Sequence, residues 1–433
     1  MPAPGPSDRW RAFRLLALSQ ATHAAGDVLV AVALADTLFF SVPLGEARGK
    51  VALYLGLTMA PFAVLSPLVG PWLDRRRGSY RAAIVLAMAA RVLLAVLLSS
   101  RTDRLLLYPL AFGLLVLSRV HAVSRAALVP EVTPPGRTLL WANGRLAVIA
   151  VLAGAVAAGP ALLLNHFLGP AAALWAAALT FAGGVAAGLG LPLPDRSARR
   201  RGDRPAPYRE LLSSRLLAGG VVMATMRAAV GFTTFLLAFL LRAEGAGGRG
   251  LAAVVLAASV GGLAGSVLAP ALRHTLSESL LLLAGPLVVG LSAVWTAGAF
   301  SLASATVLAA VVGLTAAAGR LAFDSLLQGD APEHVRARTF ARYETIFQLC
   351  WVAGAGLAAA LPFRPGEGLG TLAGLCLLGL LVSARGLLRR RHAAARRGAV
   401  PRGQREWVVR GVLRREAALR RVQPDRDHPD RPG

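Results

Sequence analysis

The chain has 433 residues, of which 55% are hydrophobic and 16% are charged, and its formal net charge is +25. A mean hydropathy of +0.58 excludes an ordinary soluble protein of this length, which would expose a more polar surface. The positive charge lies in short clusters between long apolar runs, a pattern that sets membrane topology rather than one that binds nucleic acid.

A helix that crosses a membrane needs about 20 mostly apolar residues. Such runs predict an all-α membrane protein with twelve transmembrane helices, at residues 15–40, 50–72, 81–99, 105–124, 139–164, 170–191, 216–241, 250–270, 278–299, 302–322, 339–361 and 368–388. The first run is too long for the apolar part of a removable signal peptide, so we expect it to remain as a helix.

The long link between the sixth and seventh predicted helices divides the chain into two six-helix halves. We expect an N-terminal segment (1–14), an N-terminal half (15–191), a central loop (192–215), a C-terminal half (216–388) and a basic tail (389–433). Apolar residues of the tail can share one face with arginines opposite, which predicts an amphipathic helix on an anionic membrane surface.

Basic residues are distributed unevenly between the two sides of the predicted helices. With the N-terminus placed inside, the inner segments hold 23 Lys and Arg residues before the tail, and the outer loops hold 7. This bias predicts that both termini are cytoplasmic and that the protein lies in the cytoplasmic membrane. Nearly all basic residues are Arg, with Lys50 the single Lys, which favours a GC-rich bacterial source.

Two short segments repeat at an offset of 199 residues. Pro71 to Arg75 maps onto Pro270 to His274, and Leu128 to Glu131 maps onto Leu327 to Asp330. Both pairs follow corresponding helices of the two halves, which indicates pseudo-symmetric halves of equal topology. Parallel repeats of this kind are a common plan for secondary transporters.

The loop after the second predicted helix resembles a motif of the major facilitator superfamily. The family pattern is Gly, three residues, Asp, Arg, one residue and Gly. Gly70, Asp74 and Arg75 match it, and the second glycine comes one position late as Gly78. The resemblance covers residues 10–390 and implies the fold of that superfamily, with Asp74 in a gating contact between the halves and the neighbouring arginines as topology anchors.

Weaker matches resemble the drug-exporter and siderophore-exporter branch of the same superfamily. Gly159-Pro160 resembles the antiporter-like turn of the fifth helix, although the following residues depart from it. The Arg125 to Pro130 segment and Ala142-Asn143 are also similar to bacterial exporters. This resemblance implies export of a small organic solute.

Ionisable residues inside predicted spans need a functional or structural reason, because a charge in hydrocarbon is costly. Asp27, in the middle of the first helix, could take up and release a proton as a central cavity faces each side in turn; a structural hydrogen bond is the alternative. His23 lies one turn earlier on the same face and could extend the proton path, or could simply be hydrogen-bonded.

Arg227, Arg119 and Asn143 are the predicted polar residues of the substrate cavity. Arg227, midway along the seventh helix, either pairs with Asp27, binds an anionic substrate or forms a structural ion pair. For Arg119 an equal alternative is a side chain that extends to the membrane surface. Arg91 is expected to have a structural partner.

Three further charges lie on the tenth and eleventh predicted helices. Arg320 and Asp324 are four residues apart and can pair along one helix face, and both are placed near the inner membrane surface. Glu344, about one turn from the predicted start of its helix, is expected to have an interfacial role.

The sequence therefore predicts a secondary transporter that works by alternating access, with protons, a small solute and the lipid bilayer as partners. We expect a monomer, without a cofactor, metal or nucleic acid, that exports its solute by proton antiport. No Walker loop, HExxH, CxxC or GxSxG pattern in a suitable context is present, so we predict no enzymatic activity. The alternatives are a membrane-embedded enzyme or lipid-handling protein, and a sensor built on a transporter fold.

Overall fold

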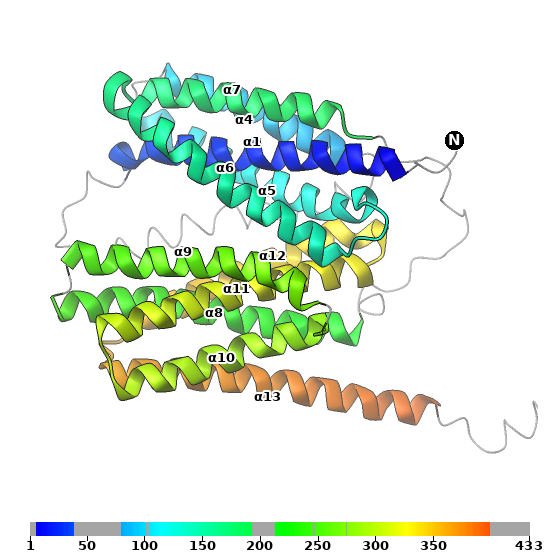
Figure 1. Cartoon of the computed structure of the whole chain (residues 1–433), viewed down its shortest axis with the longest axis vertical. Helices are drawn as coiled ribbons and strands as arrows, with labels where there is room; N and C mark the ends of the chain where they lie inside the picture. Colours follow the sequence, from blue (N-terminus) through cyan, green and yellow to red (C-terminus); the bar gives the residue numbers. More distant parts are fainter. Residues whose placement is uncertain are drawn as a thin grey trace, which may run out of the picture. The chain divides into compact units, whose positions relative to one another are not determined.

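The computed structural model describes residues 6–38, 79–100, 104–192, 213–245, 247–273 and 275–398. Contacts divide the chain into two compact units, residues 1–383 and 384–433, and all contacts described below lie within the first unit. The regular structure of the described residues is entirely α-helical (Figure 1). The helices are α1 (Pro6–Leu38), α4 (Ser79–Ser99), α5 (Arg104–Val132), α6 (Leu139–Leu168), α7 (Pro170–Leu189), α8 (Ser214–Ala243), α9 (Gly247–Leu272), α10 (Glu278–Gly298), α11 (Leu302–Asp330), α12 (Glu333–Ala360) and α13 (Pro365–Gly398).

Each of these helices corresponds to one predicted span, and the all-α fold is confirmed. The predicted span at 50–72 and the gating loop with Gly70, Asp74, Arg75 and Gly78 lie outside the described residues. The total of twelve helices therefore stays a prediction, as do the roles of the four loop residues.

Two of the short connections between helices have clear local causes. Gly169, with a φ of 82°, separates α6 from α7, and Pro170 then begins α7; a positive φ favours Gly, and Pro is suited to the first helical turn. Ser301 and Ser304 form a reciprocal capping box. This box fixes the start of α11 after the short connection from α10.

Ten of the described helices are long and apolar enough to cross a membrane. The exception is α12, whose first half contains Arg336, Arg338, Arg342 and Glu344. Glu344 forms an ion pair with Arg320 of α11, so this charged side chain of α12 faces protein rather than lipid.

Close helix contacts in the C-terminal half depend on glycine. A Cβ atom at Gly261 of α9 would overlap the carbonyl oxygen of Ala310 in α11, and one at Gly313 of α11 would overlap that of Ala258 in α9. Inside a bilayer, helices associate through packing rather than through expulsion of water, so small residues at such crossings are stabilising.

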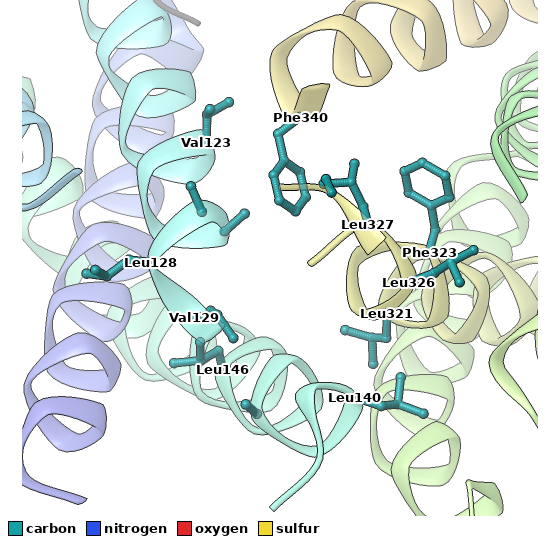
Figure 2. Close-up of a cluster of buried hydrophobic side chains, with 14 of the residues drawn as sticks. Val123, Leu128, Val129, Leu140, Leu146, Leu321, Phe323, Leu326, Leu327 and Phe340 are labelled. Carbon is teal, nitrogen blue, oxygen red and sulfur yellow. The ribbon is translucent and has the colours of Figure 1, made fainter. Parts of the chain in front are cut away.

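The buried apolar side chains form three clusters in the described part of the chain. One combines both halves at the end of the bundle where α1 and α6 begin and where α5 and α11 end; we call this the joined end. Figure 2 shows its side chains from α5 (Val123, Val129) facing those of α11 (Leu321, Leu327) and α12 (Phe340). The other two clusters each belong to a single half, so the halves share a core at the joined end.

Side-chain hydrogen bonds also connect the halves at the joined end. Asn143 Nδ2 of α6 donates to Gln328 Oε1 of α11 at 2.7 Å, and Gln328 Nε2 donates back to Asn143 Oδ1 at 3.2 Å. Gln328 Nε2 also donates to the carbonyl oxygen of Ala126 in α5 at 2.9 Å. This amide pair satisfies polar groups that would otherwise be buried without partners.

Candidate functional site

A cavity of about 240 Å³ lies between the two halves and is lined by residues of six helices. Polar lining comes from Gln20 of α1, Asn143 of α6 and six charged residues: Arg119, Arg125, Arg227, Arg320, Asp324 and Glu344. Apolar lining comes from Ala122, Val123, Ala126, Ala147, Leu321 and Phe340. The cavity can therefore contact both a charged group and an apolar body.

Arg320 is the centre of the ion pairs in this cavity. Its Nε atom lies 3.0 Å from Asp324 Oδ1, one turn further along α11, and its Nη1 atom donates to Glu344 Oε2 of α12 at 2.7 Å. The pairing of Arg320 with Asp324 predicted from their spacing is confirmed. Both carboxylates of the cavity lining thus share one guanidinium group.

Arg125 of α5 and Arg227 of α8 approach the cavity from opposite halves. The Nε atom of each is buried without a hydrogen-bond partner. Among the described residues, no carboxylate lies within ion-pair distance of either side chain. Asp324 and Glu344 act on both arginines across a longer distance.

A second polar cluster lies inside the N-terminal half. Arg91 of α4 forms an ion pair with Asp27 Oδ1 of α1 and donates to His23 Nδ1 at 2.7 Å. Ser118 of α5 donates to Asp27 Oδ2 at 3.1 Å, and the Arg91 guanidinium lies 3.9 Å from the centre of the Phe181 ring of α7. Because Arg91 can act only as a donor, His23 Nδ1 is an acceptor and the proton of the neutral ring is on Nε2, which faces Asp27 at 3.4 Å.

His121 extends this cluster along α5. Its ring is stacked on that of His23 with centroids 4.1 Å apart, and its Nε2 atom lies 3.0 Å from the hydroxyl oxygen of Ser19. Electrostatic interactions of His23 with Arg119 and Arg125 connect the cluster to the charges of the cavity. We call Asp27, His23, Arg91 and His121 the α1–α4–α5 cluster.

The structure corrects the suggested pairing of Arg227 with Asp27. In the described part of the chain, the ion-pair partners of Asp27 are Arg91 and His23, whereas Arg227 lines the cavity. The expectation that Arg91 has a structural partner is confirmed, although that partner is Asp27 itself.

Four charges that were predicted near the inner membrane surface line the cavity, while their depth in the membrane stays a prediction. Arg119 lies 13 residues before the end of α5 at Val132, and Arg320 lies ten residues before the end of α11. Glu344 is 11 residues from the start of α12, not one turn. These residues and Asp324 line the cavity, and α5 and α11 continue beyond the apolar runs that predicted them.

The remaining predicted site residues lie apart from each other. Asn143 lines the cavity and also forms the amide pair with Gln328. Gly159 and Pro160 lie inside α6 rather than at a turn, at exposed positions. Sequence reasoning missed Arg125 and Gln20 as site residues. Gln20 lies three residues before His23 and Arg125 lies four residues after His121, so helical spacing to those histidines was the available signal.

Comparisons with known proteins agree with this architecture. The family model described as Major Facilitator Superfamily matches residues 16–355. The uncharacterized protein ML2143 of Mycobacterium leprae is 32% identical over 409 residues, which cover 84% of this chain and 70% of that protein.

Solved structures are similar in fold at low sequence identity. The crystal structure of the human organic anion transporter MFSD10 (TETRAN) is matched with a TM-score of 0.68 and 16% identity, over 87% of this chain and 99% of that chain. A bacterial homologue of the iron transporter ferroportin, in an outward-facing state, is matched with a TM-score of 0.62 and 18% identity, over 88% and 98% of the two chains.

Proposed function

This chain belongs to the major facilitator superfamily and is a multi-pass membrane transporter rather than an enzyme, and from that premise we propose that it exports a small organic solute by proton antiport. The single observation that supports this proposal best is the polar cavity between halves that share a core at the joined end. A solute held between two halves is released to alternate sides when the halves rock about it, which is alternating access.

The α1–α4–α5 cluster is the proposed site of proton coupling. The Asp27 side chain is 40% exposed, whereas its partner Arg91 is 1% exposed, so protons can reach the carboxylate while the guanidinium stays fixed. Protonation of Asp27 removes the charge that holds it to Arg91 and His23. The resulting change in the contact of α1 with α4 is a physical route from proton binding to helix movement.

The predicted orientation completes the proposal. We place the protein in the cytoplasmic membrane of a bacterium, as a monomer with both termini cytoplasmic, on the strength of the basic-residue bias. The joined end then faces the cytoplasm. The assignment to an exporter-like branch rests on the motif resemblances around Arg125 and Asn143.

The test uses purified protein in liposomes loaded with a panel of small organic solutes. We expect an inwardly directed proton gradient to accelerate efflux of at least one solute by wild-type protein. Asp27→Asn, which cannot ionise, should retain downhill flux and lose its dependence on the pH gradient. Glu244→Gln is the matched control, because it neutralises an exposed acid at the end of α8.

Two results would reject parts of this proposal. Gradient-dependent flux by Asp27→Asn equal to that of wild type would remove the α1–α4–α5 cluster as the coupling site. An absence of protein-dependent flux for every solute in both directions would reject transport and favour a sensor on a transporter fold.

A further inference from the structure

The charges that line the cavity do not balance. Four arginines (Arg119, Arg125, Arg227 and Arg320) face two carboxylates, Asp324 and Glu344. Both carboxylates form their ion pairs with Arg320. The lining therefore has a formal excess of two positive charges.

Arg125 and Arg227 contribute most directly to this excess. Each has a buried Nε atom without a hydrogen-bond partner, and no described carboxylate lies within ion-pair distance of them. A cation in the interior of a membrane protein is costly unless it is paired or solvated. An anion that enters the cavity would supply the missing partner.

We propose that the cavity is a binding site for a small organic anion, with Arg125 and Arg227 as the residues that bind its carboxylate or phosphate group. Guanidinium groups suit this chemistry, because their planar set of N–H donors matches carboxylate and phosphate oxygens. The inference rests on the proposed function and deepens it, since it names the substrate class of the same cavity.

The rest of the lining restricts the body of that anion. Val123, Ala147, Leu321 and Phe340 supply apolar contacts, and Asn143 and Gln20 supply amide groups. The volume of about 240 Å³ is below the about 300–1,000 Å³ of pockets that hold drug-sized ligands. A compact anion with an apolar or hydroxylated body fits these limits better than an extended one.

The position of the two arginines connects anion binding to the movement of the halves. Arg125 belongs to α5 of the N-terminal half, and Arg227 belongs to α8 of the C-terminal half. An anion bound to both would join the halves around itself. Electrostatic interactions of Arg125 and Arg119 with His23 also let the anion influence the proposed proton site.

The test measures ligand-dependent thermal stabilisation of the full-length protein in detergent, which reports binding to the folded state. The probes are benzoate, succinate and glycerol 3-phosphate, each compared with its uncharged analogue: benzamide, succinamide and glycerol. We expect at least one anion to raise the melting temperature in a saturable manner and its uncharged analogue to have no effect. The carboxylate and phosphate probes distinguish the two anion chemistries.

Variants locate the binding site. Arg125→Gln and Arg227→Gln should each weaken binding of the active anion about tenfold or more, the size expected for loss of a hydrogen bond to a charged group. Arg242→Gln is the matched control, because it removes the same charge from an exposed position of α8. Glu344→Gln should tighten binding of the anion, since it frees Nη1 of Arg320. A variant that only damaged the structure would weaken binding instead.

The proposal is overturned if no anion of the panel stabilises the protein more than its uncharged analogue. It is also overturned if Arg125→Gln and Arg227→Gln bind the anion as well as Arg242→Gln does. Transport of an uncharged solute that is unaffected by both variants would reject the anion site and leave the transporter proposal intact. Saturable anion binding without flux in liposomes would reject transport and leave the anion site intact.

Discussion

Arg91 is a cation with a relative exposure of 1% inside a membrane-spanning helix. The buried positive charge of Arg91 is stabilised by the Asp27 carboxylate, His23 Nδ1 and the Phe181 ring. We predict that Arg91→Met lowers the free energy of unfolding by about 2–3 kcal/mol. Loss of a fully buried partner costs about 3–5 kcal/mol, and the 40% exposure of the Asp27 side chain reduces that amount.

Unfolding of the detergent-solubilised protein by a denaturant measures this change. The double variant Arg91→Met/Asp27→Asn should be more stable than Arg91→Met alone, because the unpaired carboxylate is then absent. The single variant Asp27→Asn completes the cycle, and stability losses of the two single variants that simply add in the double variant would show that the two side chains are not coupled.

Single residues show clearly what sequence spacing can and cannot predict. Arg320 and Asp324 are four residues apart on one helix, so their contact follows from helical geometry alone. Glu344, the second partner of Arg320, comes from another helix, and no local pattern links the two. The pairing of Asp27 with Arg91 depends likewise on how α1 and α4 each pack against α7, which hydropathy does not specify.

At the scale of elements, apolar runs located the described helices and misplaced several of their ends. The predicted span 105–124 is part of α5, which continues to Val132, and 302–322 is part of α11, which continues to Asp330. The added turns contain polar residues that face the other half or the cavity, as Gln328 and Asp324 do. A hydropathy window ends at such residues because it assumes that they face lipid.

The crossing of α6 and α9 depends on Gly144. A Cβ atom there would lie 2.5 Å from the Pro270 side chain and 3.0 Å from the carbonyl oxygen of Ser266 in α9. These helices belong to different halves, so Gly144→Val should push the halves apart at the joined end. Gly159→Val is the matched control on the same helix, because a Cβ atom at Gly159 meets no atom within 4 Å.

Spin labels on Arg137→Cys and Gly329→Cys measure this effect, since both positions are exposed and each belongs to one half. The labelled background also has Cys350 and Cys376 replaced by alanine. We expect double electron–electron resonance in nanodiscs to show a longer distance population in Gly144→Val and no change in Gly159→Val. Identical distance distributions would mean that α6 and α9 do not limit closure.

At the scale of the whole molecule, the sequence repeat has a structural counterpart. The segments from Leu128 and from Leu327, related by the offset of 199 residues, each lie near the end of a helix, α5 and α11 respectively. Both contribute to the shared core at the joined end. The repeat predicted matched halves, but it could not predict which contacts hold them together, because those contacts join residues that the repeat does not pair.

The amide pair of Asn143 and Gln328 is the contact between halves that is most open to direct test. Its two mutual hydrogen bonds are 2.7 and 3.2 Å long. Once the halves separate, water can form hydrogen bonds with both amide groups instead. Gln328→Ala also removes the bond to the carbonyl oxygen of Ala126. A net contribution of about 0.5–1.5 kcal/mol for each bond predicts that Asn143→Ala/Gln328→Ala decreases the ratio of joined to separated molecules about tenfold or more. The spin-label pair at positions 137 and 329 should then report a larger separated fraction.

Gln20→Ala is the control for this prediction. It removes an amide from the same cavity but not from this pair, so it should leave the distances unchanged. A joined fraction that is equal in the double variant and in Gln20→Ala would show that apolar packing alone holds the joined end, since the shared core of α5, α11 and α12 is intact in both variants.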